Sequence, residues 1–286
     1  MIDTLKTWCK SGQARLLAFL AGSRPAGAKT PKAGTAPADR EFLPAALEIL
    51  ETPPSPVSIA MLWFICGLFA VADGMGGHSG GERASRIAVE VMDREVAGAE
   101  AAVASSAAER LRNAARTAGA AIYDASQADA AFSGMGTTLT ALLIQQGRAH
   151  IAHVGDSRCY RLRDGKCSLL TYDHSWVSEQ VRAGLLSEED ARTSRFKHVI
   201  TRSVGFEREV EVDTRSLVLE AGDCFLLCSD GLSNYLEADE MARLLNSRFY
   251  RDVPSLLVEL ANERGGEDNI TVVLVYAAND AVASRG

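Results

Sequence analysis

The apolar residues of this chain change their spacing along the sequence, and this change limits the possible folds more than any other feature. Over residues 84–92, and again over 107–125, apolar side chains recur every three to four positions, which predicts two amphipathic helices. From Gly136 the apolar residues alternate with polar ones, which predicts strands. One buried strand, GLFAVA, is expected before the helices. The chain is therefore expected to have an α+β fold.

Strands and helices are expected in groups through the rest of the chain. A four-strand meander comes first, and Asp164-Gly165 suits a tight hairpin turn between the last two of its segments, which are GTTLTALLIQ, AHIAHVGD, SRCYRLR and KCSLLT. Further strands are predicted at 210–219, 224–229 and 270–276, and helices at 176–184, 187–192, 238–246 and 253–263. This grouping favours two antiparallel sheets covered by helices on their outer faces.

Composition limits the partners and the compartment. A formal net charge of −7 and thinly spread Lys and Arg residues leave no basic footprint for nucleic acid, so nucleic acid is not an expected partner. The six cysteines form no CxxC pair and no close framework of a small secreted domain. They are expected to be reduced thiols, mostly in core strands, which favours a cytoplasmic protein.

The N-terminal part of the chain has a different composition from the rest. Seven Lys or Arg residues and two acidic residues occur in the first 40 positions, and residues 1–56 are predicted to be a basic, proline-rich tail. Residues 57–72 carry no charge, but these sixteen positions fall short of the roughly 20 that span a bilayer. A buried strand is the preferred interpretation of their second half, and a membrane anchor stays the alternative.

Three aspartates stand where an apolar strand stops or starts. Asp73 follows GLFAVA, Asp230 follows CFLLCS, and Asp268 lies just before ITVVLVY. They are expected to cluster at one end of the sheets. Carboxylates at strand ends, with glycine beside them, suit a hard cation that binds oxygen ligands and several waters.

These stretches resemble the PPM (2C) family of metal-dependent serine/threonine protein phosphatases, including its compact bacterial members. The matching motifs occur in the family's order over residues 68–276; they are VADGMGGHSGGERAS, SGMGTTLTALLI, AHVGDSRCYRL, DHSW, LLCSDGLSNYL and GGEDNITVVLV. The resemblance implies a four-layer αββα sandwich. It also implies hydrolysis of phosphoserine and phosphothreonine in proteins that a Ser/Thr kinase has phosphorylated.

The resemblance further implies a dinuclear Mn²⁺ or Mg²⁺ centre. Asp73 would bridge the two metals, the Gly74 carbonyl would bind one of them, and Asp230 with Asp268 would hold the other. Asp156 is expected to help bind a third metal, although a loop aspartate that caps backbone amides is the structural alternative. Two such metals can share a water, lower its pKa and aim it at phosphorus.

Residues around the metals are expected to meet the substrate. His78 resembles a histidine that could protonate the leaving seryl oxygen. Residues 176–208 correspond to the family's flap, the surface segment that shapes substrate access, and His198 and Arg202 within it are weaker candidates for substrate contact. His150, His153 and His174 are expected to be structural.

The chain departs from the family upstream of the first Asp-Gly motif. The usual phosphate-gripping Arg and the Asn-Glu-Asp or Asn-Gln-Asp triplet are missing there, and the sequence from residue 39 to 72 resembles instead the N-terminal segment and anchor of type I secretion adaptor (membrane fusion) proteins. The expected organisation is therefore an adaptor-like tail over 1–56, a phosphatase domain over 57–278 whose first two strands are replaced, and a C-terminal tail over 279–286. An active phosphatase and a non-catalytic phosphoprotein- or metal-binding module are the two hypotheses that follow.

Overall fold

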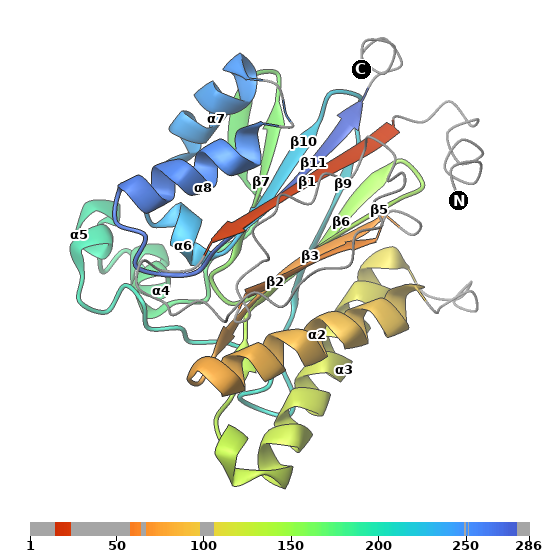
Figure 1. Cartoon of the computed structure of the whole chain (residues 1–286), viewed down its shortest axis with the longest axis vertical. Coiled ribbons are helices and arrows are strands. Elements are labelled where there is room, and N and C mark those ends of the chain that lie inside the picture. Colours follow the sequence, from red (N-terminus) through yellow and green to blue (C-terminus); the bar gives the residue numbers. More distant parts are fainter. Residues whose placement is uncertain are drawn as a thin grey trace, which may run out of the picture.

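The computed structural model describes residues 15–23, 58–63, 67–97, 106–248, 250 and 252–278. Two antiparallel sheets stack face to face in the described part, and helices lie against their outer faces (Figure 1). The α+β class and the two antiparallel sheets predicted from the sequence are confirmed.

The first sheet runs in the order β1-β11-β10-β7-β8. Its strands are β1 (Arg15–Ser23), β11 (Ile270–Ala278), β10 (Cys224–Cys228), β7 (Arg158–Arg163) and β8 (Lys166–Leu169). The predicted hairpin between β7 and β8 is confirmed, because Asp164 and Gly165 have positive φ angles of 51° and 76°. These angles match the turn type that follows the twist of paired strands.

The second sheet runs in the order β2-β3-β5-β6-β9, and a short strand pairs beside β3. Its strands are β2 (Ser58–Trp63), β3 (Leu68–Met75), β5 (Leu139–Gln145), β6 (Arg148–Val154) and β9 (Asp213–Val218), with β4 (Gly136–Thr137) as the short strand. Strand β3 is fully buried from Leu68 to Ala72, as its uninterrupted apolar sequence predicts.

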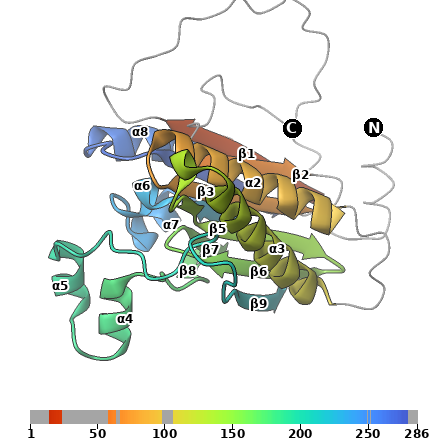
Figure 2. The ribbon, with the colours of Figure 1, turned by 90° about the horizontal axis from the view of Figure 1, so that it is seen from below.

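Two long helices cover the second sheet, and shorter ones cover the first. The long helices are α2 (His78–Ala97) and α3 (Ala107–Ala128), followed by the 3₁₀ turn η2 (Ala130–Phe132). The shorter ones are α6 (Asp230–Ser233), α7 (Ala238–Ser247) and α8 (Val253–Glu263). Helices α4 (Trp176–Arg182) and α5 (Glu188–Thr193) lie to one side of the sheets (Figure 2).

Two of these helices begin at side chains that cap them. Ser106 and Glu109 form a reciprocal capping box at α3, and Ser187 accepts a hydrogen bond from the Asp190 amide at α5. Each side chain satisfies an amide that has no partner within the helix. No helix of the described residues is long and apolar enough to cross a membrane.

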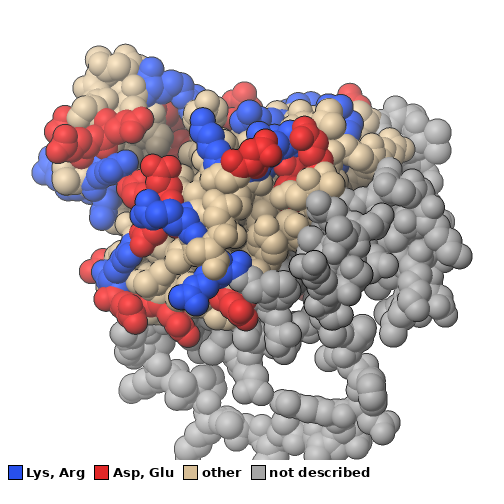
Figure 3. Space-filling model, turned by 90° about the horizontal axis from the view of Figure 1, so that it is seen from above, with Lys and Arg blue, Asp and Glu red and all other residues tan. Residues whose placement is uncertain are grey.

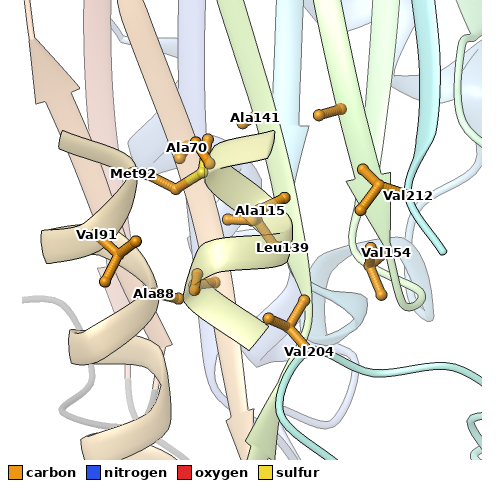
Figure 4. Packing of buried hydrophobic residues seen from close by; sticks show 14 of the residues in the cluster. Ala70, Ala88, Val91, Met92, Ala115, Leu139, Ala141, Val154, Val204 and Val212 are labelled. Carbon is orange, nitrogen blue, oxygen red and sulfur yellow. The ribbon is translucent and has the colours of Figure 1, made fainter. Parts of the chain in front are cut away.

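Three apolar clusters hold the layers together. The first lies between α2, α3 and the second sheet, where Met92 and Ala115 lie beside Ala70 and Leu139 (Figure 4). The second fills the space between the sheets and includes Phe69. The third lies under α6, α7 and α8. Burial of apolar surface at all three levels is the main force that fixes the sheets relative to each other.

Two strands lie upstream of β3, where the sequence departs from the family's pattern and the first two strands were expected to be replaced. Strand β1 pairs with β11 along its whole length, and β2 pairs with β3 from Ser58 to Trp63. Strand pairing uses backbone groups, so a segment of foreign sequence can occupy a strand position. Strand β1 lies inside the predicted tail, and the sheet therefore extends beyond the predicted boundary at residue 57.

Candidate active site

Asp73 stands at the end of the buried part of β3, and two threonines fix its backbone. Its amide donates to the Thr138 hydroxyl over 2.9 Å. Its carbonyl accepts from the Thr138 amide at 2.8 Å and from the Thr137 hydroxyl at 2.9 Å. Three hydrogen bonds on the backbone of one residue leave its carboxylate a narrow range of positions.

Asp230 and Asp268 come from two neighbouring strand ends that one serine joins. Ser229 donates its hydroxyl to the Asn269 carbonyl at 2.9 Å and accepts from the Thr271 amide at 3.0 Å. Because β10 and β11 are adjacent and antiparallel, the residue after β10 and the turn before β11 lie at the same edge of the sheet. Asn234 then donates to the Asp230 carboxylate at 3.2 Å.

The predicted aspartates act on one another through their charges. Burial, and then the charges of Asp230, Asp268 and Asp156, raise the pKa of Asp73 well above its ordinary value. Burial and the Asp268 charge likewise raise the pKa of Asp230, although His198 and Asn234 act in the opposite direction. Carboxylates perturb one another in this way only when they are close. The structure therefore brings together all four predicted acidic residues.

Asp156 lies in the Asp156 loop, which we define as residues 155–157 between β6 and β7. Burial, the charge of Asp230 and the charge of Asp173 raise the pKa of Asp156 to about 8, against the opposing effect of Arg158. Arg158 is mainly engaged by Asp173, which it holds through two guanidinium nitrogens at 2.9 and 2.7 Å. The Asp156 carboxylate is thus buried beside another acidic group.

The glycines after Asp73 allow the chain to turn closely into α2. A Cβ atom on Gly74 would lie 2.0 Å from the Gly81 carbonyl oxygen, and one on Gly81 would lie 2.6 Å from the Gly74 carbonyl oxygen. Both distances are too short for any side chain, so this contact requires two glycines. His78 begins α2, but its side chain lies outside the described part of the structure.

The flap residues separate into two groups. His198 is exposed on the flap, and its charge lowers the pKa of Asp230, which places it near the carboxylates. Arg202 is engaged elsewhere, since it forms ion pairs with Asp213 at 3.0 Å and Glu211 at 3.2 Å. Arg202, a weaker candidate for substrate contact, therefore has two acidic partners of its own, and its guanidinium group is not free.

The three remaining histidines have structural contacts, as expected. His150 lies 2.8 Å from the Ser216 hydroxyl. His153 bridges the Thr140 hydroxyl and the Tyr172 carbonyl, each at 2.9 Å. His174 accepts a hydrogen bond from the Gly155 amide at 3.0 Å.

The donor atoms of the cluster fit a hard divalent cation. They are carboxylate oxygens with a backbone carbonyl beside them, which Mg²⁺ and Mn²⁺ prefer. Among the described residues, no three His, Cys, Asp or Glu side chains enclose an ion by themselves. The nearby thiol of Cys228 is fully buried, and burial raises its pKa to about 12, which leaves it in the unreactive thiol form.

Some residues of the site escaped the sequence analysis. Thr138 accepts the Asp73 amide and lies 2.7 Å from the buried Ser157 hydroxyl, so it connects Asp73 with the Asp156 loop. Asn234 supports Asp230. Both residues stand within the motifs GTT and DGLSN, whose short polar side chains beside a strand end were the available signal.

A cavity of about 610 Å³ lies away from the carboxylates. It is lined by residues of α3, β6 and β9 and of the segment after β8, and none of the four aspartates reaches it; the lining residues are Arg112, Ile151, His153, Leu170, Thr171, Tyr172, Val212, Asp213, Thr214 and Arg215. The described residues on the face in Figure 3 carry basic and acidic side chains intermixed, without one large patch of a single charge.

The sequence and the structure both match known phosphatases. A family model described as protein phosphatase 2C matches residues 63–269. The serine/threonine phosphatase stp of Listeria monocytogenes is 40% identical over 207 residues, which cover 72% of this chain and 82% of the relative.

Solved structures show the same fold. The Mycobacterium tuberculosis serine/threonine phosphatase PstP/Ppp matches with a TM-score of 0.75 and 29% identity, covering 92% of this chain and 99% of that one. A PstP catalytic domain solved with two manganese ions matches with a TM-score of 0.73 and 29% identity, covering 92% and 98%. The chain therefore belongs to the protein phosphatase 2C family of metal-dependent protein serine/threonine phosphatases.

Proposed function

We propose that this phosphatase works at a dinuclear Mn²⁺ or Mg²⁺ centre held by Asp73, the Gly74 carbonyl, Asp230 and Asp268. The observation that carries the proposal is the mutual effect of these carboxylates, which raise the pKa of Asp73 and Asp230. Crowded carboxylates repel one another, and divalent cations remove that repulsion. Two manganese ions in the PstP structure support the number of cations.

The residues of this chain have distinct roles in the proposal. When bound, the cations supply positive charge to the phosphate and lower the pKa of the attacking water. Thr137 and Thr138 hold the Asp73 backbone, and Asn234 orients the Asp230 carboxylate. His198, whose charge acts on Asp230, is proposed to contact a substrate phosphate, and His78 at the start of α2 is the proposed proton donor to the leaving oxygen.

Asp156 is proposed to help bind a third cation. Burial and two acidic neighbours raise the pKa of Asp156, so cation binding would relieve an unfavourable charge there as well. The proposed substrates are proteins phosphorylated on serine or threonine. The proposed compartment is the cytoplasm, which the four described thiols support, since Cys159, Cys167, Cys224 and Cys228 are all free.

The test is hydrolysis of a phosphothreonine peptide and of p-nitrophenyl phosphate by the metal-free protein, before and after Mn²⁺ or Mg²⁺ is added. We expect no turnover without a cation and full recovery with Mn²⁺. Activity that persists in excess chelator would refute the dinuclear centre. A protein that binds Mn²⁺ without hydrolysing either substrate would support the non-catalytic alternative.

A further inference from the structure

His174, Arg202 and Asp213 form a compact group at the base of the flap, which we call the flap-base cluster. His174 stands just before the flap, Arg202 near its end, and Asp213 at the start of β9. The Asp213 carboxylate lies 3.3 Å from His174 Nε2 and 3.0 Å from an Arg202 guanidinium nitrogen. One acidic side chain therefore joins the two ends of the flap, which carries α4 and α5 beyond the sheets (Figure 2).

Hydrogen bonds determine the tautomer of His174. The Gly155 amide donates to Nδ1 at 3.0 Å, so in the neutral ring the proton is on Nε2, which then donates to Asp213. Arg202 Nη1 also lies 3.1 Å from Nε2, but both groups are donors in this tautomer. Arg202 instead donates to Asp213 and forms an ion pair with Glu211. The imidazole thus uses both of its nitrogens.

The backbone of His174 connects the same segments again. Its amide donates to the Gly155 carbonyl at 2.7 Å, and its carbonyl accepts from the Thr201 amide at 2.9 Å. Gly155 is the neighbour of Asp156, and Thr201 is the neighbour of Arg202. His174 therefore links the Asp156 loop, both ends of the flap and β9.

The charges of the cluster favour this arrangement. Burial raises the pKa of Asp213, but the hydrogen bond from His174 and the charge of Arg202 outweigh burial, so the pKa of Asp213 is lowered. Burial and the Arg202 charge lower the pKa of His174. The cluster is therefore held as a carboxylate between a neutral imidazole and a guanidinium.

A purely structural role would not require such a group. An ion pair of a partly exposed carboxylate, such as Asp213 with 47% of its side chain exposed, adds little net stability. Its geometry, however, is specific, because each partner accepts only certain directions of approach. Moreover, the neighbouring Asp173 holds Arg158 through a bidentate ion pair, so the segment before the flap contacts the start of β7 as well as the Asp156 loop.

We propose that His174, through Asp213 and Arg202, is a positioning residue that fixes the flap against the Asp156 loop and thereby sets how a protein substrate is held over the metal centre. This inference rests on the proposed function. The effect should be largest for substrates that reach the flap. A small substrate such as p-nitrophenyl phosphate contacts the centre alone and should depend on the cluster much less.

Two isosteric changes separate the two sides of the imidazole. His174→Asn keeps an acceptor near the Nδ1 position but loses the contact with Asp213, whereas His174→Gln keeps a donor near the Nε2 position but loses the contact with Gly155. Asp213→Asn removes the charge at constant volume. Arg208→Gln is the matched control, since Arg208 is also in the flap but pairs with the exposed Asp124 outside the cluster.

The experiment compares kcat and KM for a phosphothreonine peptide and p-nitrophenyl phosphate at saturating Mn²⁺, with amide hydrogen exchange of the metal-free proteins. For His174→Asn and Asp213→Asn we expect kcat/KM on the peptide to fall about tenfold or more, with less than about a twofold change for the small substrate. Exchange at the Thr201 amide should become faster. The double variant, with His174→Asn and Asp213→Asn together, should lose less transition-state stabilisation, measured from kcat/KM on the peptide, than the two single variants lose in sum.

Distinct results identify which idea fails. If both substrates lose activity in parallel with a lower melting temperature, or if Arg208→Gln behaves like the cluster variants, the cluster is merely structural and the inference is wrong. If the unmodified protein shows no Mn²⁺-dependent hydrolysis of either substrate, the proposed function fails instead.

Discussion

Asp230 and Asp268 illustrate how single residues are placed by the strands that carry them. Each stands at the end of a strand, and Ser229 joins the two strand ends. We predict that Asp230→Asn or Asp268→Asn lowers kcat on p-nitrophenyl phosphate by at least about a hundredfold, or about 3 kcal/mol, because each change deletes a charge that would hold a cation in the proposed centre. Steady-state kinetics at saturating Mn²⁺ measures this.

The matched control is Asp239→Asn, an exposed aspartate in the first turn of α7. Its kinetics should be unchanged. Circular dichroism should show that all three variants fold. Near-normal rates in both site variants would contradict the assignment of these ligands.

His153 gives a second prediction at this scale, on the pH dependence of stability. Burial and the neighbouring His174 lower the pKa of His153 to about 4. The unfolded chain, with a pKa near 6.5, then takes up a proton that the folded protein resists. Stability is thus fully present above about pH 6.5 and is lost as the pH falls towards 4, by about 2 kcal/mol between pH 7 and 5.

Urea unfolding of the unmodified protein and of His153→Gln at pH 7 and pH 5 measures this effect. The variant should be less stable at pH 7 and should lose less stability on acidification. Because the carboxylates are the same in both proteins, their own pH dependence cancels in the comparison. An equal loss in both proteins would show that His153 is not the source, and the exposed His198→Gln serves as the control.

The candidate site was predictable where function depends on local sequence, and less so where it depends on distant contacts. Asp73, Asp230 and Asp268 each follow or precede an apolar strand, so their clustering follows from the strand pattern alone. The acidic partners of Arg202 were not predicted, because Asp213 lies eleven positions away on a different element. The support that Thr138 gives to Asp73 comes from 65 positions away and has no sequence spacing of its own.

At the scale of elements, periodicity predicted the helices and strands from β3 onward except the short helix α6 and the 3₁₀ turn η2. Strand β3, the two long helices and the β7–β8 hairpin all formed where apolar spacing and turn residues indicated. Strands β1 and β2 were not predicted, because neither belongs to a motif of the family. The place of β1 depends on pairing with β11, which is far away in the sequence. The place of β2 depends on pairing with β3, which follows it in the sequence.

This pairing changes what the unusual N-terminus should do. We predict that replacing residues 1–67 with the N-terminal strands of a compact bacterial family member changes the melting temperature little, because β1 and β2 already pair with both sheets. The KM for a phosphopeptide should nevertheless fall by about tenfold, since the graft restores an Arg that can bind phosphate in a bidentate manner.

Calorimetry and steady-state kinetics on the two proteins test both halves of this prediction. A large gain in melting temperature would show that β1 and β2 are poor substitutes for the family's strands. An unchanged KM would show that another group already binds the phosphate. The same graft with the restored Arg changed to Ala is the control for the second half.

For the whole molecule, the site couples metal binding to stability. The proposed ligands lie in β3 and next to the ends of β10 and β11, which belong to different sheets, so unfolding would release the cations. We predict that Mn²⁺ at one hundred times its dissociation constant stabilises the protein by about 3 kcal/mol, or about 5 to 10 °C in melting temperature. Thermal unfolding with Mn²⁺ or with chelator measures this.

The control for this prediction is Asp230→Asn, which should melt at a temperature that Mn²⁺ changes much less. The metal-free variant should in turn be no less stable than the metal-free parent, since it has lost a carboxylate from a repulsive cluster. An equal shift by Mn²⁺ in both proteins would mean that the cation binds elsewhere.

The pairing of β1 with β11 also affects how the protein is made. A ribosome releases β1 long before β11, so the pairing of β1 in the first sheet cannot form until β11 has been synthesised. Asp268 emerges only at that late stage. Until then, a nascent chain carries β1 without its neighbour β11. The contact between these two strands is long-range, and contacts of this kind form slowly. Until Asp268 emerges, the proposed set of carboxylates is also incomplete, so dephosphorylation is expected only after that point.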